Sequence, residues 1–519
     1  MKHFIPAWYS QKRWWADKAE PFYNKRLVTE FDDLISLMNM HQKHQIDFDI
    51  LVLNYFPDLR TFLHRHQLFE ANYWSLFDEI QGFSHRTPQA IDYRQLQWPA
   101  ETEFVFTPFL MRGVTSPSTY TNIYFNQEGY IVWLEDFEGL KKQRRYIFDD
   151  RGWLSAIRNY DENGQDVNQQ YMTADGDCIL TEDLVTKQIV VSDKYRHRFD
   201  QAEYATMTEF IQAQFKHYTA KHYQVDDVTI AAADDRHNAL ITENIAPEHL
   251  CFSIYSQRNK ELNDQTLASV HKGQYWLVDR QDHEAALMLY QSKHHLDNQL
   301  MRITPFDAQV LPNISSQLYE TYIGLWLDGL VEQDMQRIVT SLTAYIQAHE
   351  GYRLLLLTKH DQNEVSPWLK EHIKIINDKY NEVEPDDEGV NQLVAEDEDY
   401  VKLLELQHVP FEMDLFEVVS KLRIVIDLNQ EPDLFLQICS ISAGLPQINQ
   451  RETEYVTHDK NGKIISSEVE MIAALDYFLD HLKHSNYSFA YSIKLVDEYA
   501  SEQIIDQLDR LIEGEMHGA

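Results

Sequence analysis

The stretch LRIVID at residues 422–427, followed by EPDLFLQICSISAGLP at residues 431–446, decides the fold of this 519-residue chain. The first run is apolar and β-branched, which predicts a buried strand. The second predicts a short loop, a helix and a tight Gly-Leu-Pro turn into another strand. A long amphipathic helix is expected from about Val469. Strand, helix and strand in this order favour an α/β domain with a parallel sheet.

The amino-terminal part is also predicted to be α/β. Strands are expected at Phe4-Ile5 and at Asp49–Leu53, with helical spacing of apolar residues between them. The chain has no glycine before Gly82. A strand-to-helix turn that binds phosphate needs glycine where the backbone approaches the phosphate. The first such turn is therefore a poor phosphate site.

A different pattern occupies residues 104–191. Glycines recur there every 10 to 13 residues, mostly after Asp, Asn or Glu: Gly129, Gly139, Gly152, Gly164 and Gly176. The runs between them are rich in aromatic and β-branched residues. Turn signals at this spacing predict an antiparallel β-meander.

Two Rossmann-like domains, with this meander inserted in the first, are the predicted fold class. The first domain resumes with a helix at 202–218 and strands near 228–230, 252–254 and 276–278. In the second, strands are expected at 353–357, 400–404 and 422–427. The predicted boundaries are 1–103 and 201–304 for the first domain, 104–200 for the meander, 305–484 for the second domain, and 485–519 for a segment whose helix packs back on the first domain.

The amino-acid composition excludes several classes of function. Lys and Arg total 46 against 83 Asp and Glu, a net charge of −37, which opposes binding to nucleic acid and general adsorption to anionic lipid. Three scattered cysteines, Cys178, Cys251 and Cys439, suit a reducing compartment. With no signal peptide and no apolar run near the ~20 residues that span a bilayer, we expect a cytoplasmic protein.

The stretch at 431–446 resembles the nucleotide-sugar half of GT-B glycosyltransferases. The pattern there is Glu, seven residues, a second Glu and a Gly-Leu-Pro-type turn, and the second Glu holds the ribose hydroxyls of the donor. Glu431 matches the first, but Cys439 stands at the second position, and a thiol cannot accept two hydroxyl hydrogen bonds as a carboxylate does. Glu431, Cys439, Gly444 and Pro446 are then remnants of a donor site, with no catalytic residue, cofactor or metal expected.

Across its length the chain resembles the glycosyltransferase-like subunit of the accessory Sec system. The resemblance rests on the opening FIPAWY at residues 4–9, the inserted meander, and the Gly444-Leu445-Pro446 turn. It implies two other accessory secretory proteins and a SecA-type motor ATPase as partners, and glycosylated serine-rich-repeat adhesin preproteins as cargo. It also implies peripheral association with the inner face of the membrane through the complex, and a meander that corresponds to the sheet by which related glycosyltransferases engage a protein acceptor.

Contacts to a partner or an acceptor are predicted on the meander and the first domain, with the following aromatic candidates: Trp8, Tyr9, Trp133 and Trp153. Each of these rings also suits core packing. Asp234-Asp235-Arg236-His237 follows a strand and either faces a cleft or forms a charged loop. The stretch 382–399 has nine acids and no Lys or Arg, which suits either a solvated linker or docking to a basic surface.

Three functions remain open from the sequence. The first is a non-catalytic, glycosyltransferase-like scaffold in an export complex. The second is an active cytosolic glycosyltransferase that modifies serine/threonine-rich protein, and the third is a chaperone that binds glycans on the preprotein. Cys439 and the missing glycines favour the first over the second.

Overall fold

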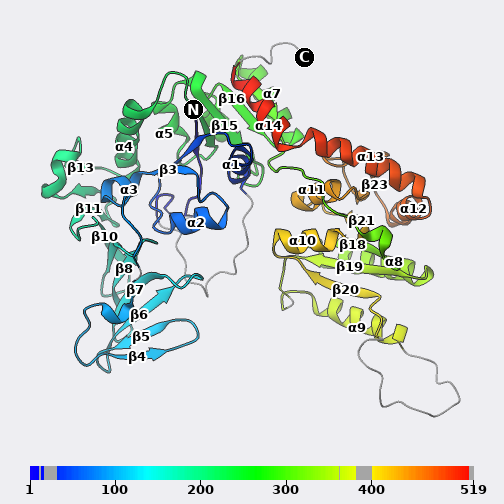
Figure 1. Cartoon of the computed structure of the whole chain (residues 1–519), viewed down its shortest axis with the longest axis horizontal. Helices are drawn as coiled ribbons and strands as arrows, with labels where there is room; N and C mark the ends of the chain where they lie inside the picture. Colours follow the sequence, from blue (N-terminus) through cyan, green and yellow to red (C-terminus); the bar gives the residue numbers. More distant parts are fainter. Residues whose placement is uncertain (11–12, 17–31, 90, 362, 382–399, 514–519) are drawn as a thin grey trace. The chain divides into compact units, whose positions relative to one another are not determined.

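The computed structural model describes residues 1–10, 13–16, 32–89, 91–361, 363–381 and 400–513. These residues form two compact units (Figure 1). The first unit extends to Pro305 and includes the residues from Leu508 onward, and the second extends from Phe306 to Gln507. The acidic stretch 382–399 lies outside the described residues.

A parallel sheet of seven strands forms the centre of the first unit, in the order β17-β16-β15-β14-β1-β2-β3. The strands are β1 (Lys2–Ile5), β2 (Phe48–Val52), β3 (Asn72–Ser75), β14 (Val228–Ala232), β15 (Leu250–Ile254), β16 (Tyr275–Val278) and β17 (Gln299–Arg302). Every residue of β15 and β16 is buried, as expected for strands that helices cover on both faces.

The helices of the first unit connect these strands. They are α1 (Asp33–Lys43), α2 (Leu59–Arg65), α3 (Leu76–Gln81), α4 (Met207–His222), α5 (Asn238–Asn244), α6 (Asp264–Val270) and α7 (Gln281–His294), with short 3-10 turns η1 (Tyr93–Gln95), η2 (Asp193–Arg198) and η3 (Pro247–His249). The start of α1 shows how local sequence sets a boundary, because the Asp32 carboxylate accepts from the N–H groups of Leu34 and Ile35, each at 3.1 Å.

The predicted meander is a ten-stranded antiparallel sheet, in the order β13 to β4. Its strands are β4 (Glu103–Phe106), β5 (Met111–Val114), β6 (Thr119–Phe125), β7 (Ile131–Glu138), β8 (Lys141–Phe148), β9 (Leu154–Tyr160), β10 (Asp166–Met172), β11 (Cys178–Asp183), β12 (Ile189–Val191) and β13 (Glu203–Tyr204). Side chains such as Ile147 and Tyr171 are fully buried in one core shared with the parallel sheet. The meander is thus a continuous part of the first unit.

The second unit has a six-stranded parallel sheet in the order β20-β19-β18-β21-β22-β23. Its strands are β18 (Thr321–Trp326), β19 (Tyr352–Thr358), β20 (Leu404–His408), β21 (Leu422–Asp427), β22 (Gln447–Asn449) and β23 (Gly462–Ile464). Its helices are η4 (Ser315–Gln317), α8 (Glu332–Ala348), α9 (Pro367–Asn381), α10 (Glu412–Val419), α11 (Leu434–Ser442), α12 (Glu468–Leu479) and α13 (Leu482–Glu498).

The strand predicted at 400–404 is placed too early. β20 begins only at Leu404, because the backbone of Val401 is held by Asn381 at the end of α9: its N–H donates to the side-chain oxygen at 2.9 Å, and its carbonyl accepts from the amide nitrogen at 2.8 Å. This strand contains several polar residues, so a search for apolar runs does not locate it.

The helix α14 (Ser501–Glu513) ends in the first unit. Lys2 Nζ lies 2.5 Å from the Asp509 carboxylate, and the Tyr275 hydroxyl donates to the Ile512 carbonyl at 3.1 Å. Among the described residues, the helices are all too short or too polar to cross a membrane.

Candidate functional site

Each parallel sheet has one switch point, where the strand order reverses direction. Ligands of α/β proteins bind at such points, outside the carboxyl ends of the strands. In the second unit the switch point lies between β18 and β21, which end at Trp326 and Asp427. In the first unit it lies between β1 and β14, which end at Ile5 and Ala232. These two edges are therefore the places to examine.

Asn429 closes the switch point of the second unit. Its side-chain nitrogen donates to the backbone carbonyl of Asp328 and to the carboxylate of Asp427, both at 2.8 Å. Gly329 has a φ of +94°, and a Cβ atom on it would lie 2.7 Å from Asn429 Oδ1. The glycine therefore lets the amide lie directly against the turn that follows β18, in the space where a ligand would enter.

The N-terminus of α11 is occupied by a carboxylate of the chain itself. Asp433 Oδ1 accepts from the N–H of Leu436 at 2.9 Å, and Asp433 Oδ2 accepts from Lys359 Nζ at 2.7 Å. Lys359 Nζ also lies 5.2 Å from the ring centroid of Trp326. Helix N-termini and lysines are groups that bind the phosphates of nucleotides. Here Asp433 binds both.

Asp427, the last residue of β21, connects these groups. Its carboxylate accepts from the backbone N–H of Asp433 at 2.7 Å and from that of Asn429 at 3.1 Å. Burial raises the pKa of Asp427 to about 6, and the hydrogen bonds oppose this rise. The three residues form one hydrogen-bonded network across the strand ends.

Glu431 and Cys439, the two positions of the donor-site pattern, lie in different surroundings. The Glu431 side chain is 64% exposed in the loop before α11, with Oε1 3.7 Å from Arg451 Nη1. Cys439 is 1% exposed inside α11. This burial favours packing as a small apolar residue.

The Gly444-Leu445-Pro446 turn has a clear structural role. The N–H groups of Gly444 and Leu445 donate to carbonyls in the last turn of α11, which ends the helix. Gly444 has a φ of +69°, and a Cβ atom there would overlap the Phe489 ring. The Pro446 carbonyl accepts from the N–H of Val425 at 3.1 Å and so leads the chain into β22.

In the first unit, Tyr9 and His237 meet at the switch point. The Tyr9 hydroxyl lies 2.5 Å from His237 Nδ1, and His237 Nε2 lies 2.6 Å from the Ala232 carbonyl. Burial lowers the pKa of His237 to about 4 and raises that of Tyr9 well above its ordinary value. The imidazole is therefore neutral, donating from Nε2 and accepting at Nδ1. This pair acts as a structural bridge.

Asp234 and Arg236 complete the closure of this edge. The guanidinium makes two hydrogen bonds to the Asp234 carboxylate, at 2.8 and 2.5 Å, and donates to the Ser10 carbonyl at 3.1 Å. It also lies 5.3 Å from the ring centroid of Tyr9. The loop after β14 is in this way fastened to the loop after β1.

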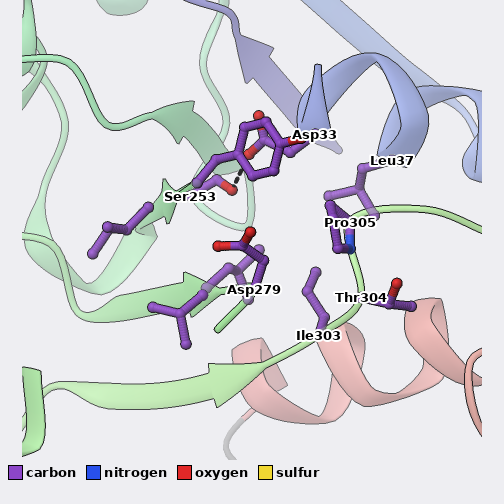
Figure 2. A pocket seen from close by; sticks show the side chains of 11 residues that line it. Asp33, Leu37, Ser253, Asp279, Ile303, Thr304 and Pro305 are labelled. Atoms are coloured by element: carbon purple, nitrogen blue, oxygen red, sulfur yellow. Dashed lines mark hydrogen bonds between the residues drawn. The ribbon is translucent and has the colours of Figure 1, made fainter. Parts of the chain in front are cut away.

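Figure 2 shows the pocket at the ends of β15 and β16. The Ser253 hydroxyl donates to Asp33, which also accepts from Arg258 at 2.8 Å, and Asp279 accepts from the N–H and the hydroxyl of Ser256 at 2.9 and 2.5 Å. The cavity volume is about 10 Å³, which is room for one water molecule. Sites for small organic ligands are far larger, about 300–1,000 Å³.

Three of the four aromatic candidates are buried in the first unit. Trp8 and Tyr9 are each 4% exposed and Trp133 is 6% exposed. Trp153 is partly exposed, with the Arg86 guanidinium 5.4 Å from its ring centroid. Burial favours core packing for the first three, and contact with a partner or acceptor stays a prediction.

Sequence reasoning singled out Asp234, Arg236 and His237 at the edge in the first unit, but it missed the residues that close the edge in the second. Asn429, Asp433 and Lys359 all lie shortly after a strand or just before a helix. Asp433 before an apolar helical run is a recognisable N-cap signal. The pairing of Asp433 with Lys359 joins residues 74 positions apart, and no spacing rule points to it.

Comparison with solved structures agrees with this architecture. The pneumococcal O-GlcNAc transferase GtfA, solved in complex with UDP and GlcNAc, matches with a TM-score of 0.67 at 12% identity, over 100% of this chain and 99% of that chain. At this identity the likeness shows the fold alone. The predicted fold class, GT-B-like with two Rossmann-like domains and an antiparallel sheet inserted in the first, is confirmed.

Closer relatives identify the family. The model of the first accessory Sec system protein, also called accessory secretory protein 1, matches residues 1–514. The chain is 48% identical, over 516 residues and 99% of both chains, to the protein of that name from Staphylococcus aureus (strain NCTC 8325 / PS 47). The crystal structure of accessory secretory protein 1, 2 and 3 in Streptococcus pneumoniae contains a chain that matches with a TM-score of 0.80 at 27% identity, over 99% of each chain. The Glycosylation Associate Protein (Gap123) complex from Streptococcus agalactiae contains a chain that matches with a TM-score of 0.79 at 30% identity, over 99% of each chain. The chain therefore belongs to this accessory Sec system protein family, as the resemblance in its sequence predicts.

Proposed function

We propose that this chain is a non-catalytic, glycosyltransferase-like subunit of the accessory Sec export complex. The observation that carries the proposal is the closure of both switch points by the chain's own side chains. Asn429 and Asp433 fill the edge in the second unit, and Arg236 with Asp234 fills the edge in the first. In a working transferase these edges bind ligand.

The energetics of donor binding support this role. A nucleotide-sugar phosphate would have to displace Asp433 from Lys359 and from the start of α11. It would also lack the carboxylate that Cys439 replaces. Losing one charge-assisted hydrogen bond costs about 1.5–3 kcal/mol, which is roughly a ten- to hundredfold loss of affinity. Both the phosphate and the ribose of the nucleotide sugar would therefore lose hydrogen bonds.

The relatives support a role in a complex. Two solved structures, of accessory secretory and glycosylation-associated complexes, each contain a chain whose fold matches this chain over 99% of its length. We infer that this chain assembles with two other accessory secretory proteins in the cytoplasm, at the inner face of the membrane. Together they deliver glycosylated serine-rich-repeat preproteins to the accessory SecA motor.

A strip across the meander is the surface that we assign to the preprotein. Tyr120 and Phe137 stack at 5.0 Å and 9°, and the Arg112 guanidinium lies 4.3 Å from the Tyr120 ring. Lys142 Nζ lies 5.9 Å from the Phe137 ring and 5.2 Å from the Tyr160 ring. All five side chains are partly exposed. Aromatic faces and cationic donors suit the sugar rings and hydroxyl oxygens of a glycosylated chain.

Calorimetric titration with UDP and UDP-N-acetylglucosamine tests the absence of catalysis. We expect no saturable heat and no sugar transfer to a serine-rich peptide, with the pneumococcal transferase as the positive control. Tight UDP binding that Glu431→Ala abolishes would contradict the proposal, as would turnover of either nucleotide sugar.

Capture of glycosylated preprotein by the purified complex tests the strip. Tyr120→Ser combined with Phe137→Ser is expected to reduce capture at least tenfold while the complex stays assembled. Phe106→Ser is the matched control, because Phe106 is 68% exposed on β4 of the same sheet, outside the strip. Unchanged capture by the double variant would exclude the strip. Point changes are preferable to removal of the meander, whose core is continuous with that of the parallel sheet.

A further inference from the structure

A second pocket in the first unit has the lining chemistry of a ligand site and room for a small ligand. It lies between β3, α3, η2 and α4, away from the switch point of the same unit between β1 and β14, and its cavity volume is about 180 Å³. The pocket of Figure 2 has about 10 Å³. We call it the α4 pocket, because five of its eleven lining residues lie on α4. It has room for one sugar-sized ring.

Apolar side chains provide the interior of the α4 pocket. Leu76 is fully buried and Ile80 is 5% exposed. Trp74 stacks on Tyr218 at 4.0 Å and 23°, and Tyr218 stacks on His222 at 4.7 Å and 21°. Three rings held in one stack form a stiff wall, because none can turn without losing contact with its neighbour. This interior suits the body of a ring compound.

The polar groups of the pocket are mostly donors. Arg198 and Lys221 are exposed at it, and neither has a carboxylate partner among the described residues. Arg198 donates only a long hydrogen bond to the Glu79 backbone carbonyl, at 3.4 Å. Gln214 Nε2 is buried and finds no acceptor in the described part of the chain. The Glu79 carboxylate already accepts from the Trp74 indole N–H. The pocket therefore suits a ligand that supplies acceptors.

The charged groups in the pocket lining include more cations than acids. Glu79 is the one acid in the pocket lining, and the lining residue His217 lies 2.8 Å from Asp200 outside it. Two cations without a carboxylate partner in one pocket stand out on a chain with a net charge of −37. A guanidinium fork and an ammonium together match a carboxylate or a phosphate.

We propose that the α4 pocket binds a ring compound of about monosaccharide size that carries one phosphate or carboxylate group. The ring lies against the Trp74–Tyr218 stack, and its anionic oxygens accept from Arg198 and Lys221. This site is independent of the export role proposed above. Such a ligand is either a free small molecule or the carboxylate of an aromatic residue at the end of another protein chain.

Calorimetric titration of the full chain with four probes tests the proposal. Phenyl phosphate carries ring and anion, inorganic phosphate carries the anion alone, benzyl alcohol carries the ring alone, and N-acetylphenylalanine mimics a chain end. We expect saturable binding of phenyl phosphate or N-acetylphenylalanine, at least tenfold tighter than that of either half-probe. The tighter of these two indicates which source supplies the ligand.

Substitutions locate the binding. Arg198→Gln and Lys221→Gln are each expected to weaken it about tenfold, the lower bound for a charge-assisted hydrogen bond. Lys260→Gln is the matched control, since Lys260 is exposed and does not line the pocket. No saturation below about 1 mM of either full probe would overturn the proposal. Equal binding of inorganic phosphate or benzyl alcohol, or equal loss in the control, would overturn it as well. Because Arg198 is a surface residue, its variant stays folded and interpretable.

Discussion

Gly444 combines two requirements in one residue. Its φ of +69° costs any other residue roughly 1–2 kcal/mol, and its α-carbon faces the Phe489 ring. We expect Gly444→Ala to lower the free energy of unfolding by about 2–3 kcal/mol in urea titrations. Gly351→Ala is the control in the same unit, with a φ of +80° and no atom closer than 4.0 Å, and should cost about 1–2 kcal/mol. Equal losses would show that the Phe489 contact contributes nothing.

Cys439 offers a direct test of whether the donor site can be restored by one change. We expect Cys439→Glu to destabilise the second unit by several kcal/mol, because the new carboxylate would be buried without a partner. It should give no UDP binding in calorimetry. Cys439→Ala, which removes one buried sulfur, should cost about 1 kcal/mol. A stable Cys439→Glu protein that binds UDP would show that residue 439 alone separates this chain from a transferase.

At the scale of the element, the start of α11 depends on Asp433. Asp433→Ala removes the cap of Leu436 and the ion pair with Lys359 together. We expect a loss of about 1–2 kcal/mol in unfolding titrations, mainly from the cap. Lys359→Met keeps the cap and removes only a partly exposed ion pair, so it should cost about 0–1 kcal/mol. A larger loss in Lys359→Met than in Asp433→Ala would reverse this assignment.

The elements also show what sequence can predict. Apolar runs locate β21, and the Gly-Leu-Pro turn locates the end of α11, because local chemistry decides both. The start of β20 is missed because its position depends on Asn381, a residue more than twenty positions away from Leu404. The closure of the switch points could not be predicted from the sequence either, because it also depends on residues that are far apart in the chain. Arg236 meets Ser10 across 226 residues, and only the folded sheet brings them together.

At the scale of the whole molecule, buried carboxyl groups make stability depend on pH. Burial raises the pKa of Asp279 in the first unit, and of Asp427 in the second, to about 6. A carboxyl group whose pKa is higher in the folded than in the unfolded chain holds its proton more tightly when folded. Its contribution is therefore complete below about pH 4 and is lost as the pH rises to about 6.

Asp279→Asn should flatten this dependence. Two pKa units correspond to about 3 kcal/mol at 1.36 kcal/mol each, so we expect the wild-type first unit to lose about 2–3 kcal/mol between pH 4 and 7 through this residue. Urea unfolding at a series of pH values measures the slope. The exposed control Asp226→Asn should keep the wild-type slope. A variant Asp279→Asn with an unchanged slope would contradict the assignment.

The contacts of α14 with Lys2 and Tyr275 have a consequence for biosynthesis. A ribosome makes residues 1–305 first, then the whole second unit, and only then Leu508 to Glu513. The partner of Lys2 is thus made 507 residues later, and the partner of Tyr275 is made 237 residues later. A nascent chain can fold its second unit on the way, but it leaves one face of the first unit uncovered until Leu508 to Glu513 have been made. The first unit is therefore completed only after the second unit has been made.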